Sequence, residues 1–207
     1  LLREAGIPFE EIMVRFDSFD PGSQFKRSLG DVSPTGKVPV LVDDGLVVWD
    51  TLAIAEYVAE RFADRQLLPA DTKARARARS ICAEMHAGFT ALRSACPMNV
   101  EASLPDTGAL IWRDRPAVRA DVERIVQMWT SLLETHGGPL LFGNFSIADA
   151  YFEPVCMRLH TYALLVPEHI AAYVARVRTL PGVKAWIDGG LAEKDFLGFE
   201  EPYRLRG

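Results

Sequence analysis

An acid and a hydroxyl, Asp50 and Thr51, stand between a short apolar run and a helical pattern, an arrangement suited to binding an amino-acid head group. Asp50 is a favourable N-cap residue, and apolar residues recur after it at helical spacing. A helix N-terminus carries free N–H groups and positive partial charge, so it binds carboxylates. Thr51 adds a hydroxyl donor, and Asp50 adds a carboxylate that can receive an ammonium group. The pair therefore predicts a site for a carboxylate and an ammonium together, with an ordinary capped core helix as the alternative.

A proline just before this pair suggests a second binding element. Pro39 follows Val38 near the start of an apolar run. Proline cannot donate a ladder hydrogen bond, so it is expected at a strand start or on an edge. A cis Val38–Pro39 bond would turn the backbone N–H and C=O of Val38 outward, where they can pair with an extended peptide. The alternative is that Pro39 only marks the beginning of the strand.

The elements that must position these residues are a hairpin and a helix. Two runs rich in β-branched residues, 38–42 and 46–49, are separated by a turn that contains Asp44 and Gly45. Asp-Gly supplies the positive φ that a tight hairpin needs. The second strand leads directly into the helix predicted for residues 50–62. The sequence therefore predicts that the peptide edge and the helix start lie close together.

These segments resemble the glutathione-binding half of the glutathione S-transferase superfamily. The resemblance is carried by GKVPVL, by the acid-hydroxyl pair in WDT and by the helical segment LAIAEYVAERF. A later segment, FGNFSIADAYFEPV, is similar to the motif of that family's helical domain. The resemblance implies that the backbone of Val38 pairs with the cysteinyl part of glutathione, beside Pro39. It further implies that Asp50 and Thr51 hold the γ-glutamyl end and that Lys37 reaches the glycyl end.

The resemblance covers essentially the whole chain and implies its organisation. The expected fold class is α/β plus all-α, with a thioredoxin-like N-terminal domain at 1–65, a linker at 66–72 and an all-helical domain at 73–207. In the first domain, residues 9–16 are expected to form a strand and residues 21–29 a short helix. Beyond the linker only helical periods appear. The family works as a dimer, so a homodimer is expected.

The catalytic residue of the family lies before the segment with which this sequence starts. The opening residues, LLREAGIPFEE, resemble the last turn of the family's first helix and the start of its second strand. The family's catalytic Ser, Cys or Tyr belongs to the first strand or the start of that helix. The first strand is therefore absent from these residues, and the catalytic residue is expected in the N-terminal segment before Leu1.

The resemblance implies a pocket for a small hydrophobic electrophile between the two domains. The first long helix of the second domain should face it. Candidate pocket residues are His86, Phe89, Arg93, Met98 and Trp112. Trp112 falls in a stretch, 101–115, that we expect to form a flexible loop over the cleft.

Composition narrows the class of function. The chain has 207 residues, 49% hydrophobic and 25% charged, with a formal net charge of −5, which argues against nonspecific nucleic-acid binding. No apolar run approaches a membrane span. Three cysteines without metal spacing fit reduced thiols in a cytoplasmic protein, and the scattered histidines predict no metal site.

We therefore expect a glutathione transferase that uses glutathione as co-substrate and conjugates its thiolate to the electrophile. Two alternatives remain open on the same fold. One is a glutathione-dependent thiol-disulfide or dehydroascorbate reductase, which needs a cysteine before Leu1. The other is a noncatalytic scaffold that binds a partner protein or an apolar ligand, because fold does not determine function.

Overall fold

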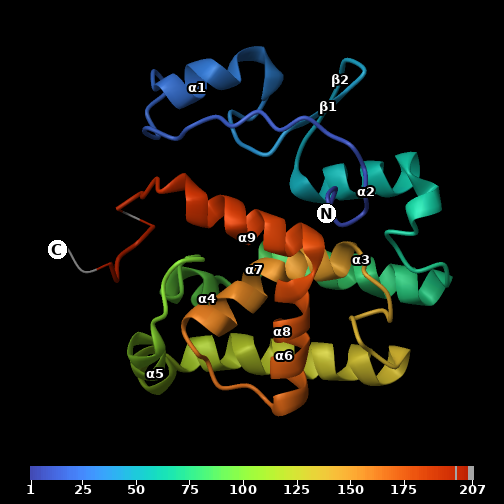
Figure 1. Ribbon diagram of the computed structural model, residues 1–207, viewed down its shortest axis with the longest axis vertical. Helices are drawn as coiled ribbons and strands as arrows, with labels where there is room; N and C mark the ends of the chain where they lie inside the picture. Colours follow the sequence, from blue (N-terminus) through green and yellow to red (C-terminus); the bar gives the residue numbers. More distant parts are fainter. Residues whose placement is uncertain (199, 205–207) are drawn as a thin grey trace.

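The computed structural model describes residues 1–198 and 200–204, which form a small N-terminal part and a larger helical part (Figure 1). In Figure 1 the N-terminal part, drawn in blue to teal, lies above the helices that are drawn in green to red. The helix α2 is the element of the N-terminal part that lies beside the helical part. Contacts between α2 and α3 join the two, so residues at the start of α2 can meet side chains from the helical part.

The N-terminal part contains the hairpin and the helix that the sequence predicts. Its elements are α1 (Gln24–Leu29), the 3₁₀ helix η1 (Gly30–Val32), β1 (Leu41–Asp43), β2 (Leu46–Val48) and α2 (Thr51–Arg61). The strands are antiparallel, with Leu41 opposite Val48 and Asp43 opposite Leu46. Between them Asp44 and Gly45 have φ of 47° and 82°, the pair of positive values that a type I′ turn requires.

The strand expected at residues 9–16 is not formed. This segment lies outside helices and strands, and the sheet of the described residues contains only β1 and β2. A strand exists through hydrogen bonds to a neighbouring strand. Neither β1 nor β2 pairs with this segment, so it has no ladder of hydrogen bonds to make it a strand.

The first helix is shorter than the expected range of 21–29. It begins at Gln24 because Ser23 caps it, and the Ser23 hydroxyl accepts a hydrogen bond from the Lys26 N–H. The Asp17 carboxylate also accepts from the N–H groups of Gln24 and Phe25, at 2.8 and 3.0 Å. These two acceptors satisfy the free donors of the first turn and so define where the helix starts.

The helical part follows the short 3₁₀ helix η2 (Ala63–Arg65). Its elements are α3 (Thr72–Ala87), α4 (Thr90–Ala95), α5 (Pro105–Asp114), α6 (Pro116–His136), α7 (Ile147–Thr161), α8 (Glu168–Thr179) and α9 (Pro181–Glu193). The expectation of a flexible loop at 101–115 is wrong, because most of it forms α5. Pro105 starts this helix, and the preceding Leu104 N–H donates to the Thr161 carbonyl at 2.7 Å, which holds it against the end of α7.

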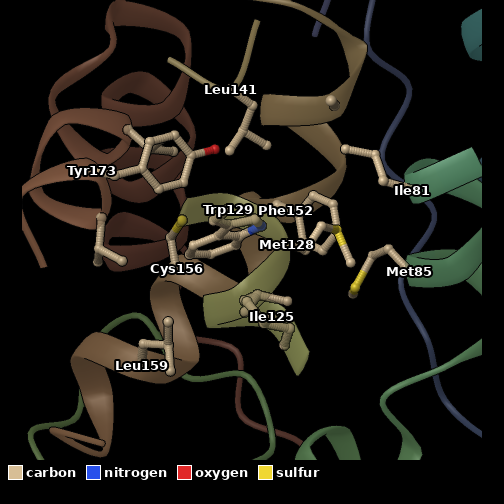
Figure 2. Packing of buried hydrophobic residues seen from close by; sticks show 14 of the residues in the cluster. Ile81, Met85, Ile125, Met128, Trp129, Leu141, Phe152, Cys156, Leu159 and Tyr173 are labelled. Carbon is tan, nitrogen blue, oxygen red and sulfur yellow. The ribbon is translucent and has the colours of Figure 1, made fainter. Parts of the chain in front are cut away.

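The core of the helical part surrounds Trp129 of α6. Figure 2 shows the Trp129 indole among side chains from α7 and α8, including Phe152, Cys156 and Tyr173. The ring of Trp129 meets Phe152 and Tyr173 edge to face, with centroids 5.4 and 4.8 Å apart. Trp129 and Phe152 are fully buried, so their contact stabilises the packing of the helical part. The helices α3 and α7 of this part carry side chains that face the N-terminal part.

A capping box joins α7 to its neighbours. The buried Asp149 carboxylate accepts from the Ser146 N–H and hydroxyl, from the Leu141 N–H and from the Tyr173 hydroxyl, at 2.9 to 3.1 Å. Burial raises the pKa of Asp149, and these four donors oppose that rise. The next residue after the cap, Ile147, donates its N–H to the Leu67 carbonyl at 2.9 Å. The capping box therefore also anchors the segment between the two parts of the chain.

Candidate functional site

Asp50 caps α2 at the point where the chain leaves β2. Its Oδ1 accepts from the Leu52 N–H at 3.1 Å and from the Thr51 hydroxyl at 3.3 Å. Both oxygens remain close to solvent, because the Asp50 side chain is 56% exposed. The structure thus places a carboxylate and a hydroxyl together at the positive end of α2, as the sequence predicts.

A depression of about 460 Å³ opens beside this carboxylate. It is lined by Trp49, Asp50, Leu52, Ala53, Glu56 and His86. The first five come from the end of the hairpin and from α2, and His86 comes from the last turn of α3. The surface of the depression is mainly apolar, and the carboxylates of Asp50 and Glu56 and the imidazole of His86 lie around it. This arrangement can hold an ammonium group next to an aliphatic chain.

Val38 is an exposed residue whose backbone groups make no backbone hydrogen bond within the described residues. The Val38–Pro39 peptide bond is cis, as is Trp49–Asp50, and Val38 is 54% exposed. No backbone hydrogen bond joins Val38 to another residue in the part of the chain that the structure describes. Its N–H and C=O can therefore pair with an extended ligand in the manner of an added strand.

Lys37 is held in a tight turn before Val38. The buried Ser33 hydroxyl accepts from the Lys37 N–H at 3.0 Å and donates to the Lys37 carbonyl at 2.6 Å. Both backbone groups of Lys37 are thus occupied by one side chain. The Lys37 N–H is therefore unavailable to a ligand, and the ammonium is the charged group that can reach one.

A residue that the sequence analysis did not single out lies under Thr51. The Tyr151 hydroxyl of α7 is buried beside the Thr51 side chain, although the two groups do not meet in hydrogen-bond geometry. Burial raises the pKa of Tyr151 to about 12, and the Thr51 side chain opposes that rise. The hydroxyl therefore stays protonated at neutral pH. Its only sequence signal is its place two residues after Asp149, in the second turn of a capped helix.

Glu56 is a second residue that the sequence analysis missed. It lies four residues after Leu52, on the same face of α2, so helical spacing alone would have brought it into the lining. Its carboxylate receives both arms of the Arg79 guanidinium, at 2.9 and 2.7 Å. This ion pair links α2 to α3 beside the depression.

The five residues expected around an electrophile lie in different surroundings. His86 lines the depression next to Asp50. Phe89 is buried and faces Phe152 across 6.4 Å between ring centroids, so its side chain belongs to the core. Arg93 is exposed and donates to backbone carbonyls at the end of α3.

The other two lie further along the chain. Met98 is half-buried, with its sulfur 3.7 Å from the Arg158 guanidinium. Trp112 packs in α5 against the core, and its carbonyl accepts from Arg119. Only His86 of the five shares the depression beside Asp50, so the position of an electrophile pocket stays a prediction.

The three cysteines are buried and reduced. Burial raises the pKa of the Cys82 and Cys96 thiols to about 12, and burial also raises the pKa of the Cys156 thiol well above its usual value. Since the thiolate is the reactive form, these sulfurs are poor nucleophiles at neutral pH. A thiol-disulfide mechanism would therefore need a cysteine from outside residues 1–207.

The described residues contain neither a cluster of metal ligands nor a helix that could cross a membrane. No three His, Cys, Asp or Glu side chains among them gather as a metal site. None of their helices combines the length and the apolar character that crossing a bilayer requires.

The chain is similar to known proteins in both sequence and fold. Residues 1–61 match the family model for the glutathione S-transferase N-terminal domain. The glutathione S-transferase GstA of Escherichia coli O157:H7 is 33% identical over 191 residues, which cover 88% of this chain and 87% of GstA. A probable maleylacetoacetate isomerase of Caenorhabditis elegans is 41% identical over 69 residues, about a third of each chain.

The fold of a solved structure also resembles that of this chain. The crystal structure of a glutathione transferase homologue from Burkholderia gl BGR1, with bound glutathione, superposes with a TM-score of 0.67. It is 26% identical to this chain and covers 92% of it, and the match spans 88% of that chain. The predicted fold class, a thioredoxin-like N-terminal domain followed by an all-helical domain, is thereby confirmed. The chain belongs to the glutathione S-transferase superfamily.

Proposed function

We propose that this protein is a glutathione transferase that binds glutathione at the start of α2 and transfers its thiolate to a small hydrophobic electrophile. One observation carries the proposal: the Asp50 carboxylate and the Thr51 hydroxyl stand together at the N-terminus of α2, beside an open depression. Charge complementarity assigns the parts of the ligand. The γ-glutamyl ammonium binds Asp50, and its α-carboxylate binds the N-terminus of α2 and Thr51.

The rest of the tripeptide follows the backbone of Val38. The N–H and C=O of Val38, which make no backbone hydrogen bond within the described residues, pair with the cysteinyl residue. The ammonium of Lys37 pairs with the glycyl carboxylate at the other end. The names of the relatives support this choice of ligand, and the Burkholderia homologue was crystallised with glutathione.

The chemistry rests on activation of the glutathione thiol. A cysteine thiol has a pKa near 8.5, and a hydrogen bond to the sulfur favours the thiolate. A Ser, Tyr or Cys from the N-terminal segment before Leu1 supplies that hydrogen bond in this proposal. The thiolate then forms a bond to the electrophilic carbon, which releases its leaving group with the bonding electrons. Holding both reactants in one site adds a proximity contribution.

We further propose that the protein acts as a cytoplasmic homodimer. Three reduced, buried cysteines suit a reducing compartment. Trp49, which lines the depression, is 42% exposed, so one side of the site remains open to a second subunit. Light scattering coupled to size exclusion would measure the mass, and a monomer at micromolar concentration would contradict the dimer.

The substitution Thr51→Val tests the glutathione site. It keeps the shape of the side chain but removes the hydroxyl, so we expect glutathione affinity to fall about three- to tenfold. Titration calorimetry with glutathione and the full-length protein would measure the change. The matched control is Thr72→Val, because Asp71 and Thr72 form the same acid-hydroxyl pair at the start of α3.

The outcomes separate the three candidate functions. Equal affinities of Thr51→Val and the unchanged protein would contradict the site assignment. A mixed disulfide with glutathione, found by mass spectrometry of the full-length protein, would favour the reductase. Absence of glutathione binding by the unchanged protein would leave the noncatalytic scaffold.

A further inference from the structure

His86 of α3 lies against the carboxylate that the proposed site uses for the glutathione ammonium. Its Nε2 is 3.4 Å from Oδ2 of Asp50, and both side chains line the same depression. We propose that His86 is a positioning residue, which orients the Asp50 carboxylate toward the ammonium of the γ-glutamyl group. This inference rests on the proposed glutathione site and adds to it a contribution from the helical domain.

The two oxygens of Asp50 have distinct partners. Oδ1 accepts from the Leu52 N–H and from the Thr51 hydroxyl, whereas Oδ2 faces His86. A carboxylate offers about four lone-pair sites. Two hydrogen bonds therefore hold Oδ1, and the His86 imidazole, 3.4 Å from Oδ2, limits the directions from which the ammonium can approach. Without His86, the Oδ2 side would lose its neighbour from the protein.

The position of His86 is fixed because several contacts hold the end of α3 in place. Gly88 follows it in an extended conformation, and a Cβ there would lie 2.6 Å from the Glu84 carbonyl oxygen. The Arg93 guanidinium then binds the carbonyls of His86 and Gly88, at 3.3 and 3.4 Å. One turn earlier, Glu84 receives both arms of Arg124 at 2.7 and 2.8 Å. The backbone that carries His86 is thus held by side chains from α4 and α6.

The other charged group in the depression does not compete for His86. Glu56 also lines it, but its carboxylate is engaged by both arms of Arg79. Of the two carboxylates that line the depression, Asp50 is therefore the one that the His86 imidazole can orient, through the contact between Nε2 and Oδ2.

The exposure of the His86 and Asp50 side chains limits how much their contact can contribute to glutathione binding. The side chains of His86 and Asp50 are 42% and 56% exposed, so their interaction is screened by water. We expect His86→Leu to weaken glutathione binding about three- to tenfold. His86→Gln keeps a donor near the Nε2 position and should restore the affinity to within about twofold of the unchanged protein.

A double-mutant cycle in the full-length protein tests whether His86 acts through Asp50. Glutathione affinity is measured by calorimetry for Asp50→Asn, His86→Leu and their combination. The expected result is that His86→Leu adds no further loss once Asp50 is replaced. A merely structural role would instead give additive losses and would not be rescued by glutamine.

The outcomes keep the inference apart from the proposed function. If Asp50→Asn weakens binding but His86→Leu leaves it unchanged or tightens it, the positioning role is wrong and the glutathione site stands. If neither substitution changes the affinity, or the unchanged protein binds no glutathione, the proposed site itself is wrong.

Discussion

Single residues in this chain acquire their roles from what surrounds them. Asp50–Thr51 and Asp71–Thr72 are the same pair at the start of two helices, and both aspartates accept a hydrogen bond from their helix. Thr72, however, lies near the Arg75 guanidinium, whereas Asp50 meets His86 at the edge of a depression. The chemistry of the pair therefore depends on the side chains that the fold brings to it.

Glu153 provides a pH-dependent prediction at the residue scale. This residue of α7 is buried, and one of its carboxylate oxygens has no hydrogen-bond partner. Burial raises the pKa of Glu153 from 4.5 to about 7, although Arg158 partly opposes the rise. The folded protein therefore holds the proton more tightly than the unfolded chain does. The stability that this proton contributes is present below pH 4.5 and is lost as pH rises through about 7.

Glu153→Gln removes this titration and should make the protein more stable than the wild type at neutral pH. The free energies of unfolding of the two proteins should differ by up to about 3 kcal/mol once the pH exceeds 7, because each unit of pKa shift corresponds to about 1.4 kcal/mol. Urea unfolding of both proteins at pH 5 and pH 8 would measure it. A difference between the two proteins that is the same at both pH values would contradict the prediction.

At the scale of elements, close backbone contacts decide where helices can lie. The helix α5 approaches the end of α7 through Gly108, where a Cβ would lie 1.7 Å from the Tyr162 carbonyl oxygen. The N–H of Leu104 binds the Thr161 carbonyl beside it. This approach explains why a stretch that the sequence suggested as a loop is a packed helix.

Gly108→Ala should destabilise the protein by about 2 kcal/mol or more, because the added methyl group forces α5 away from α7. Gly189→Ala is the matched control, since Gly189 also lies within a helix and has open space around its Cβ position. There we expect stabilisation of up to about 1 kcal/mol from the gain in helix propensity. Thermal unfolding would compare them, and equal shifts for both variants would refute the close contact.

At the scale of the whole molecule, the first residues of the chain meet its last helix. The Glu4 carboxylate accepts from the Gly182 N–H at 2.6 Å, at the positive end of α9. A Cβ on Gly182 would lie 2.7 Å from the Glu4 nitrogen, so the two backbones are close. This contact and the Ile147–Leu67 hydrogen bond help to hold the N-terminal part on the helices.

Glu4→Gln should lower the free energy of unfolding by about 1 kcal/mol, because it removes a charge at a helix N-terminus. Glu10→Gln is the control, since Glu10 is exposed in the same segment. Urea unfolding would measure both variants. If Glu10→Gln costs as much as Glu4→Gln, the loss reflects net charge rather than the contact with α9.

Much of the molecule could be predicted because its signals are local. Asp-Gly between β-branched runs specifies the hairpin, Asp50 specifies the start of α2, and the spacing from Ser146 to Asp149 specifies the capping box. Each depends on residues within a few positions of one another. The superfamily could be recognised for the same reason, because its motifs are short and separate.

Contacts between distant residues could only be decided by the tertiary structure. Local pattern suggested a strand at 9–16, but a strand also needs a partner, and no strand pairs with this segment in the described part of the chain. His86 shares an amphipathic helix with many candidate residues, and only the packing of α3 against α2 brings it to Asp50. The amino-acid sequence by itself thus determined the elements and the acid-hydroxyl pair. The tertiary structure decided which side chains surround that pair, because such contacts depend on the packing of whole helices.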